Sequence, residues 1–190
     1  MALTKSEILQ PTLWRTCRAL ASKTRLRVLS ELCAHPDQRV TDIARRLKFS
    51  LPLASQSLRA LNARGLLLAR RSGPSVCYRL GANRSIPYSE YLLQAVRKTL
   101  ANDKNALRHI FLYSTAFTHP RRILIIKTVR ERSLRLKEIA FETKIPSSAL
   151  DRHLIKLIAR GFLKHVDYRY SCSVPCHEFA RVLLLLVRQV

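Results

Sequence analysis

The feature that most constrains the fold is an internal repeat. The stretch LNARGLL, residues 61–67, returns as LIARGFL, residues 157–163. Sliding the chain along itself by about 96 positions aligns these stretches and keeps about 48 positions in register without a gap. A chance match between two amphipathic segments does not hold a register over that length. We therefore predict two related units of about 85–95 residues, each large enough to be a domain.

A second block of the repeat locates the boundary between the units. After the two ARG triplets the register slips by several residues and then recovers, with IPYSEYLL, residues 86–93, over VPCHEFAR, residues 174–181. The polar stretch ANDKN, residues 101–105, separates the units. We expect a first domain over residues 1–100 and a second over residues 101–190.

Helix caps and turn residues predict the order of elements in the first unit. Ser22, Thr41 and Ser50 stand where N-caps are expected, and Gly65 stands where a left-handed residue would end the third helix. The sequence SG followed by Pro74 is typical of a turn between two strands. The expected elements are helices around 14–20 and over 23–32, 42–47 and 51–64, strands over 66–70 and 75–80, and a closing helix over 85–100.

The second unit shows the same order. Asn102 is expected to cap its first helix, Thr118 with Pro120 to begin the next, and Gly161 to end the third. The expected elements are helices over 105–117, 120–129, 137–144 and 147–160, a β-hairpin over 162–171 and a helix over 175–190. The fold class that follows is mainly α with small β-hairpins (α+β), with a helix-turn-helix in each unit.

The charge balance points to a polyanionic partner. The chain of 190 residues has 35 Lys and Arg against 12 Asp and Glu, which gives a net charge of +23. The excess is spread evenly, with about 16 basic and 5 acidic groups in residues 1–95 and about 19 and 7 in residues 96–190. A folded chain with this much positive charge repels itself unless it works against a polyanion. Nucleic acid is the leading partner, and an anionic membrane surface is the competing one.

Other features of composition favour nucleic acid in a reducing compartment. The longest apolar run, VLLLLV, is too short to span a bilayer, and MALTKSEILQ lacks a secretory h-region, so we expect no membrane association. Five cysteines without a repeated C-x-x-C pair do not form a disulfide framework. We expect a cytoplasmic, nucleoid-associated protein that needs no cofactor.

The order of motifs resembles a known family. LASKTRLRVLSEL, VTDIARRLKFSLPLASQSLRALNARGLL and SVCYRL follow one another as in the winged-helix domain of ArsR-type bacterial transcription regulators. The second unit shows the same pattern in THPRRILIIKTV, LKEIAFETKIPSSALDRHLIKLIARGFL and YRY. The resemblance covers nearly the whole chain, twice. It implies tandem winged helix-turn-helix domains, each with a recognition helix and a wing, that bind double-stranded DNA.

The recognition helices are expected to present polar faces to DNA. Burial of the stripes at Leu58 and Leu154 turns the opposite faces outward, and side chains in the N-terminal half of such a helix reach base edges in the major groove. Bidentate geometry suits Gln56 to adenine and Arg152 to guanine. A merely solvated helix face is the alternative for any one residue. The expected contacts are Leu51, Pro52, Ser55, Gln56, Arg59, Arg64, Arg70, Arg71 and Arg79 in the first unit, and Ser147, Ser148, Asp151, Arg152, Lys156, Arg160, Lys164 and Arg169 in the second.

The family resemblance also implies dimer-like packing. Family members generally act as homodimers joined through their first and last helices. In this chain the helices around 14–20 and over 88–100 could pack against those over 105–117 and 177–187. We expect an intramolecular pseudo-dimer, monomeric in chain number, with further homodimerisation left open.

A sensing site has weak support in the sequence. The helices TDIARRL and KEIAFETK contain no cysteine. A soft metal at Cys172, Cys176 and His177 is chemically feasible, and a thiol switch of Cys33 with a partner near Cys176 resembles another branch of the family. Buried free cysteine is the commoner state, so no metal site is predicted.

Three classes of function compete with a sequence-specific regulator, most simply a repressor. An architectural or mobile-element-associated DNA-binding protein with low sequence specificity would suit the charge equally well. A protein-interaction module would need an apolar or acidic recognition face, and the +23 balance argues against it. An enzyme is disfavoured because the chain has no Gly-rich phosphate loop and no nucleophile–base signature.

Overall fold

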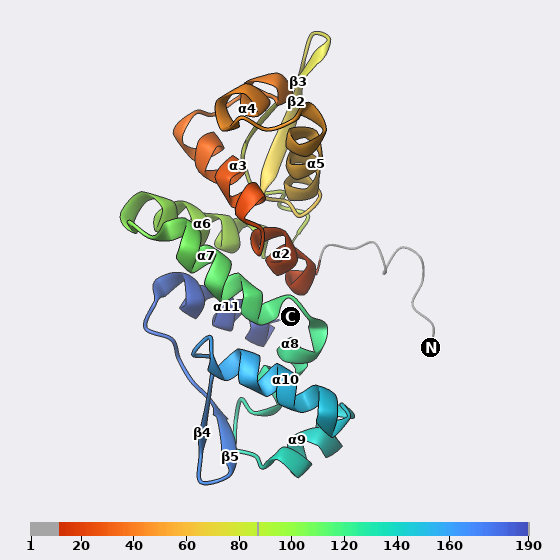
Figure 1. The fold of residues 1–190 in the computed structure, drawn as a ribbon, viewed down its shortest axis with the longest axis vertical. Coiled ribbons are helices and arrows are strands. Elements are labelled where there is room, and N and C mark those ends of the chain that lie inside the picture. The colour runs from red at the N-terminus through yellow and green to blue at the C-terminus, as the bar shows by residue number, and fades with distance from the viewer. Residues whose placement is uncertain (1–11, 87, 190) are drawn as a thin grey trace.

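The computed structural model describes residues 12–86 and 88–189, and these form two units joined by a central layer of helices (Figure 1). The fold is mainly helical with small antiparallel sheets, as predicted. The first unit consists of α2 (Leu13–Leu20), α3 (Lys23–Ala34), β1 (Gln38–Arg39), α4 (Val40–Leu47), α5 (Leu51–Asn62), β2 (Leu67–Ser72), β3 (Ser75–Leu80) and α6 (Ser89–Asn102). The second consists of α7 (Ala106–Ser114), the 3-10 turn η1 (Thr115–Phe117), α8 (Pro120–Thr128), α9 (Leu136–Thr143), α10 (Ser147–Ile158), β4 (Leu163–Val166), β5 (Arg169–Cys172) and α11 (Glu178–Gln189).

Two of the predicted serine caps are confirmed. The hydroxyl of Ser22 accepts a hydrogen bond from the backbone N–H of Arg25 at 3.5 Å, and that of Ser50 accepts one from Leu53 at 3.4 Å. Each oxygen satisfies an N–H that has no partner within the helix, so α3 and α5 begin where the sequence places them.

Predicted caps at Thr41 and Asn102 are wrong. Helix α4 begins at Val40 with Arg39 as its N-cap, because the Asp42 carboxylate accepts from the Arg39 N–H at 3.1 Å. Asn102 is the last residue of α6, and α7 begins after Asn105.

The cap predicted at Thr118 is also displaced. The N-cap of α8 is His119, whose Nδ1 accepts from the Arg121 N–H at 3.1 Å. Thr118 is used otherwise, since its hydroxyl donates to the Thr115 carbonyl at 3.4 Å. An imidazole nitrogen of His119 therefore caps α8, where the sequence predicted the hydroxyl of Thr118.

Both recognition helices end at a glycine in the left-handed region, as predicted. Gly65 has φ +70° and Gly161 has φ +76°. Only Gly65 is also sterically confined. A Cβ added at Gly65 would lie 2.6 Å from Cδ1 of Ile86, whereas a Cβ added at Gly161 would have no neighbour within 4 Å.

The two hairpins differ in size. Strands β2 and β3 pair over six residues, from Leu67 with Leu80 to Ser72 with Ser75, and the short strand β1 adds to β3. Strand β1 was missed because two residues carry no alternation pattern. Strands β4 and β5 pair over four residues, and a single bridge from Leu134 to Tyr170 stands where β1 would be.

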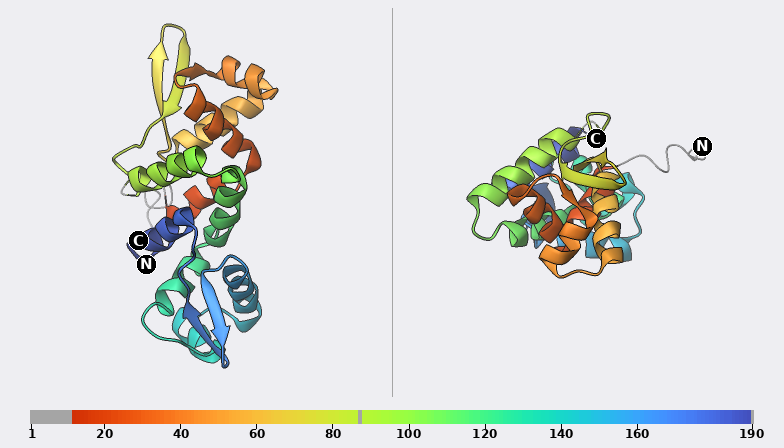
Figure 2. Two further views of the ribbon diagram at one scale, coloured as in Figure 1. Left: turned by 90° about the vertical axis from the view of Figure 1, so that its left-hand side faces the viewer. Right: turned by 90° about the horizontal axis from the view of Figure 1, so that it is seen from above.

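One hydrophobic core runs through both units. The predicted packing of the first and last helices is present, since α6 packs against α11, and α2 packs against α7 and η1. Leu13, Cys17, Phe117 and Phe179 are fully or almost fully buried in this central layer. Turned views show the same layer between the two winged units (Figure 2). Within the described residues, no helix has the length and apolar character needed to cross a bilayer.

Candidate nucleic-acid interface

The recognition helices α5 and α10 hide the predicted stripes. Ala54, Leu58 and Leu61 are wholly buried in α5, and Leu150, Leu154 and Leu157 are at most 1% exposed in α10. Ser57 is also buried, which the stripe did not predict. Burial of these faces fixes the rotation of each helix and thereby turns its opposite face to solvent.

The exposed faces differ between the two helices. In α5, Leu51, Pro52, Gln56 and Arg59 are exposed and Ser55 is half-buried. In α10 the exposed side chains are Ser147, Ser148, Asp151, Arg152 and Ile155. The first turn of α5 is therefore apolar, whereas that of α10 offers two hydroxyls, and its second turn adds a carboxylate and a guanidinium.

The first hairpin presents unpaired cations. Arg70, Arg71 and Arg79 are exposed on β2 and β3, and within the residues that the structure describes none of them forms an ion pair. Free guanidinium groups on a protruding hairpin are suited to phosphate contact.

In the second hairpin, one of the two expected cations forms contacts within the protein. Lys164 is exposed, but Arg169 donates from Nη1 to the carbonyl of Ser133 at 3.0 Å and lies 4.0 Å from the Glu138 carboxylate. Arg169 thus ties β5 to the loop before α9, a role that the sequence did not indicate.

The cations near the ends of the recognition helices lie apart from the reading faces. Arg64, Lys156 and Arg160 are half-buried, and Nε of Arg160 donates to Thr115 Oγ1 at 2.9 Å. Lys156 lines a hollow that it shares with Arg18 and Arg25 of the first unit. Burial, followed by the nearby charges of Arg160 and Arg122, lowers the pKa of Lys156. Arg15, Arg18 and Arg25 were not among the residues expected from sequence, and they line one hollow together with Arg64.

A histidine pair lies beside α10. The rings of His119 and His153 are 4.8 Å apart between centroids. Burial, then the charges of His119 and nearby arginines, lowers the pKa of His153 to about 4. Burial and arginine charge also lower the pKa of His119. The pair therefore sits in a strongly cationic environment.

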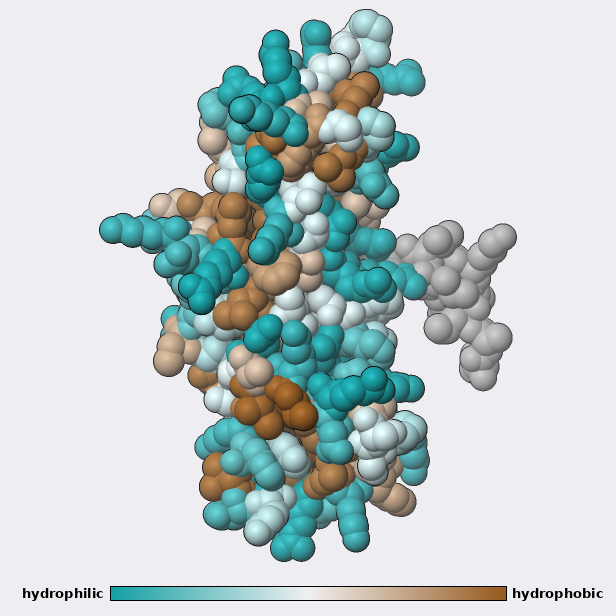
Figure 3. Space-filling model, viewed as in Figure 1, coloured by the Kyte–Doolittle hydropathy of each residue, from teal (hydrophilic) through white to brown (hydrophobic). Residues whose placement is uncertain are grey.

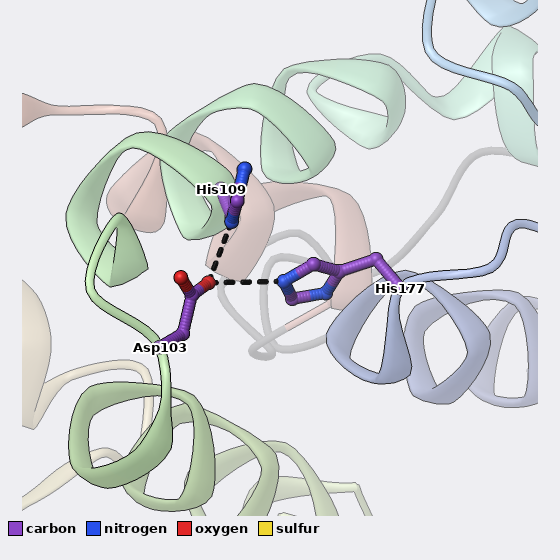
Figure 4. Close-up of side chains that lie close together, drawn as sticks. All are labelled: Asp103, His109 and His177. Carbon is purple, nitrogen blue, oxygen red and sulfur yellow. Dashed lines mark hydrogen bonds and ion pairs between the residues drawn. The ribbon is translucent and has the colours of Figure 1, made fainter.

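Three side chains of types that can bind a metal lie close together where α6, α7 and α11 meet (Figure 4). Asp103 Oδ2 accepts from His109 Nδ1 at 2.5 Å and from His177 Nε2 at 3.1 Å (Figure 4). The hydrogen bond from His109 is the largest cause that lowers the pKa of Asp103 to about 2. The three ligand atoms lie within 4.8 Å of one another, and histidine with carboxylate is a donor set that suits zinc. The hydrogen bonds already link the end of α6 to α7 and α11.

The structure does not assemble the cysteine sites considered from sequence. Among the described residues the cluster at Asp103 is the only group of three or more potential ligands, so Cys172, Cys176 and His177 do not converge. Cys33 and Cys176 are exposed free thiols, whereas Cys172 accepts from Nη2 of Arg188 at 3.5 Å.

Both helix-turn-helix segments match known protein families. Residues 119–165 match the family "Bacterial regulatory protein, arsR family", and residues 22–75 match the MarR family. One similar solved structure is the NMR structure of the homodimeric winged helix-turn-helix DNA-binding domain (fragment 1–100) of Mb0332 from Mycobacterium bovis, described as a possible ArsR-family transcriptional regulator. It is 33% identical, covers 52% of this chain and 91% of its own, and has a TM-score of 0.37. No match was found among the curated proteins.

The matched families consist of DNA-binding transcription regulators, which are not enzymes. Both matches fall on the helix-turn-helix segments that carry the internal repeat. The chain belongs to the ArsR-type winged helix-turn-helix transcription regulators, with two tandem winged-helix units in one polypeptide.

Proposed function

We propose that this chain is a transcriptional repressor that reads two unequal half-sites on one DNA duplex, one with α5 and one with α10. The observation that carries this is the pair of different exposed faces on matching scaffolds. Both helices bury the same repeat positions and end at a left-handed glycine, yet their outward side chains share no chemistry in the first turn.

Each face favours a different base pattern. The exposed amide of Gln56 can bond adenine through N6 and N7, and the exposed side chain of Leu51 can contact a thymine methyl group. On α10, Arg152 can donate twice to guanine, and Asp151 can accept from the cytosine amino group. The two half-sites are therefore expected to differ in sequence.

A pseudo-dimer within one chain supports reading both half-sites at once. The α6–α11 and α2–α7 contacts occupy the place that an interface between two chains would take, and Lys98 Nζ pairs with Glu178 Oε1 at 2.7 Å across α6 and α11. A body with two reading heads covers promoter DNA and excludes other proteins from it. We expect the chain to act as a monomer on the nucleoid, in the cytoplasm. Its two domains are expected to span residues 1–100 and 101–190.

The test is selection of bound duplexes from a random pool, followed by footprints of two variants. Gln56→Ala should weaken preference in one half-site and Arg152→Ala in the other, each by about 1–3 kcal/mol of discrimination at the contacted base. Arg108→Ala, which changes an exposed arginine on α7, is the matched control and should leave both footprints intact. Identical footprint changes from both reading-head variants would contradict the proposal.

A second candidate is a low-specificity architectural protein, favoured by the net charge of +23 and by the apolar first turn of α5. Both candidates predict a steep dependence of affinity on salt. Only the repressor predicts specific binding that is about 10³-fold or more tighter than binding to random duplex. A ratio close to one would favour the architectural role.

A further inference from the structure

Two hollows beside α2 share two of their lining residues. The first, of 310 Å³, is bounded by α2, Arg25 and the end of α5 at Arg64. The second, of 440 Å³, is bounded by Arg18, Arg25, η1 and Lys156 of α10. Both hollows are lined by Arg18 and Arg25, so they adjoin at these residues, and we call the two together the central trough.

The central trough leads from one recognition helix to the other. Arg64 follows the C-terminal end of α5, and Lys156 lies in the last turn of α10. In the ribbon, α2 lies between α5 above and α10 below, in two views at right angles (Figures 1 and 2). In the view of Figure 1, teal and white atoms extend from the α2 region down to α10, where they border a brown patch (Figure 3).

Every ionisable group among the described residues that line the central trough is cationic. None of its described lining residues is acidic, although the chain has 12 acidic residues. Like charges held close together repel one another, and binding of an anion relieves this repulsion. The pKa of Lys156 is lowered first by burial and then by the charges of Arg160 and Arg122, and the second cause agrees with this environment. The cations lining the trough are Arg15, Arg18, Arg25, Arg64 and Lys156.

Several of these guanidinium groups are held in place. Arg25 donates from Nε to the Ala19 carbonyl at 2.7 Å and from Nη2 to the Arg18 carbonyl at 2.9 Å. The guanidinium carbons of Arg15 and Arg18 lie 5.1 and 6.0 Å from the centroid of the Trp14 ring. Cations that are already ordered lose less conformational entropy when they bind, so the trough is prepared for a ligand.

The occupant with matching charge is the DNA backbone, because every described ionisable group of the trough is cationic. Two recognition helices that enter successive major grooves of one duplex leave the intervening backbone facing the protein between them. We propose that the central trough binds the phosphates of the DNA segment between the two half-sites. This inference rests on the proposed function, because it requires α5 and α10 to engage the same duplex.

The test compares two double variants of the full chain. Arg18→Ala with Lys156→Ala removes two cations from the trough, and Arg108→Ala with Lys104→Ala removes two exposed cations at the start of the second unit. Fluorescence anisotropy over a salt series gives the affinity for the selected site and for random duplex. Phosphate ethylation interference locates the contacts on the selected site.

The trough variant should lower affinity for both duplexes by a similar factor, about 10-fold or more, and reduce the salt slope by about 2, since each phosphate contact contributes about 0.9. Interference at the central phosphates should disappear while the half-site contacts persist. The control should change neither the slope nor the interference pattern. If the trough variant fails to fold by circular dichroism, Arg64→Ala replaces it, with an expected slope change of about 1.

An unchanged slope and unchanged central interference would overturn the trough assignment, and distinct effects of Gln56→Ala and Arg152→Ala would then leave the proposed function standing. Failure of the wild-type chain to select any two-part site would instead reject the proposed function. Trp14 is the single tryptophan and lines the trough, so its fluorescence can report a small anion directly. Saturation by micromolar inorganic triphosphate that persists on bound duplex would also overturn the assignment.

Discussion

The two recognition helices share their buried side and differ on their exposed side. Leu58 and Leu154 occupy equivalent buried positions, whereas the exposed Leu51 of α5 corresponds to the exposed Ser147 of α10. Folding requires an apolar stripe and a chain reversal, and these features recur in both units. Solvent-facing positions carry no such requirement. The comparison teaches that one scaffold can present two chemically different reading surfaces within a single molecule.

The terminal glycines offer the largest expected difference between the units. Gly65→Ala and Gly161→Ala should each cost about 1–2 kcal/mol from left-handed backbone strain. Gly65→Ala should lower the free energy of unfolding by a further ~1–3 kcal/mol, because the new Cβ would lie 2.6 Å from Cδ1 of the buried Ile86. Urea unfolding of both variants measures the two values. Equal losses would show that the crowding around Gly65 relaxes freely.

The two wings should also differ, by a smaller amount, in their contribution to DNA affinity. Arg71→Ala should lower the salt slope of DNA binding by about 1, because its guanidinium makes no ion pair among the described residues. Arg169→Ala should leave the slope nearly unchanged and reduce the stability of the second unit instead, since it bonds the Ser133 carbonyl. Anisotropy over a salt series and urea unfolding separate the two outcomes. A slope change from Arg169→Ala would place the second wing on DNA.

The smallest expected difference is a dependence of stability on pH in the second unit alone. His153 occupies the repeat position of Ser57, so the first unit has no equivalent group. In the folded state its pKa is about 4, below the ordinary value of 6.5, so only the unfolded chain takes up the proton between these values. Stability is therefore unaffected above pH 6.5 and falls as the pH drops from 6.5 toward 4.

His153→Gln should flatten that part of the pH profile, measured as urea midpoints at neutral and mildly acidic pH. The effect should be modest because His153 is half-exposed and its interactions are screened by solvent. His119→Gln is a useful comparison, since its ring lies 4.8 Å from that of His153 and its pKa is also lowered. A profile unchanged by His153→Gln would assign the acid sensitivity in this range to another group, such as His119, whose pKa is also lowered from 6.5.

Local chemistry made much of the fold predictable. Ser22, Ser50, Gly65 and Gly161 each act through neighbours a few residues away, so the sequence alone specifies their roles. The cap at His119 was missed because an imidazole nitrogen is rarely assigned to that position, and two-residue β1 carries no periodicity.

The reading faces were predictable to the same degree, since burial of one helix stripe determines which side is exposed. The central trough and the Asp103 cluster were not, because they join residues far apart in sequence. Arg18 and Lys156 approach each other only after α2 and α10 have packed on the shared central layer. Likewise, 74 positions separate Asp103 from His177.

The shared core has a consequence for stoichiometry. A regulator made of two separate chains loses one reading head whenever it dissociates, so its occupancy of DNA depends on a prior association between copies. Here Leu13, Phe117 and Phe179 lie in one core within one polypeptide. If the chain acts as proposed, both heads reach the duplex together at any dilution, and occupancy should follow a simple one-to-one isotherm with no threshold in protein concentration.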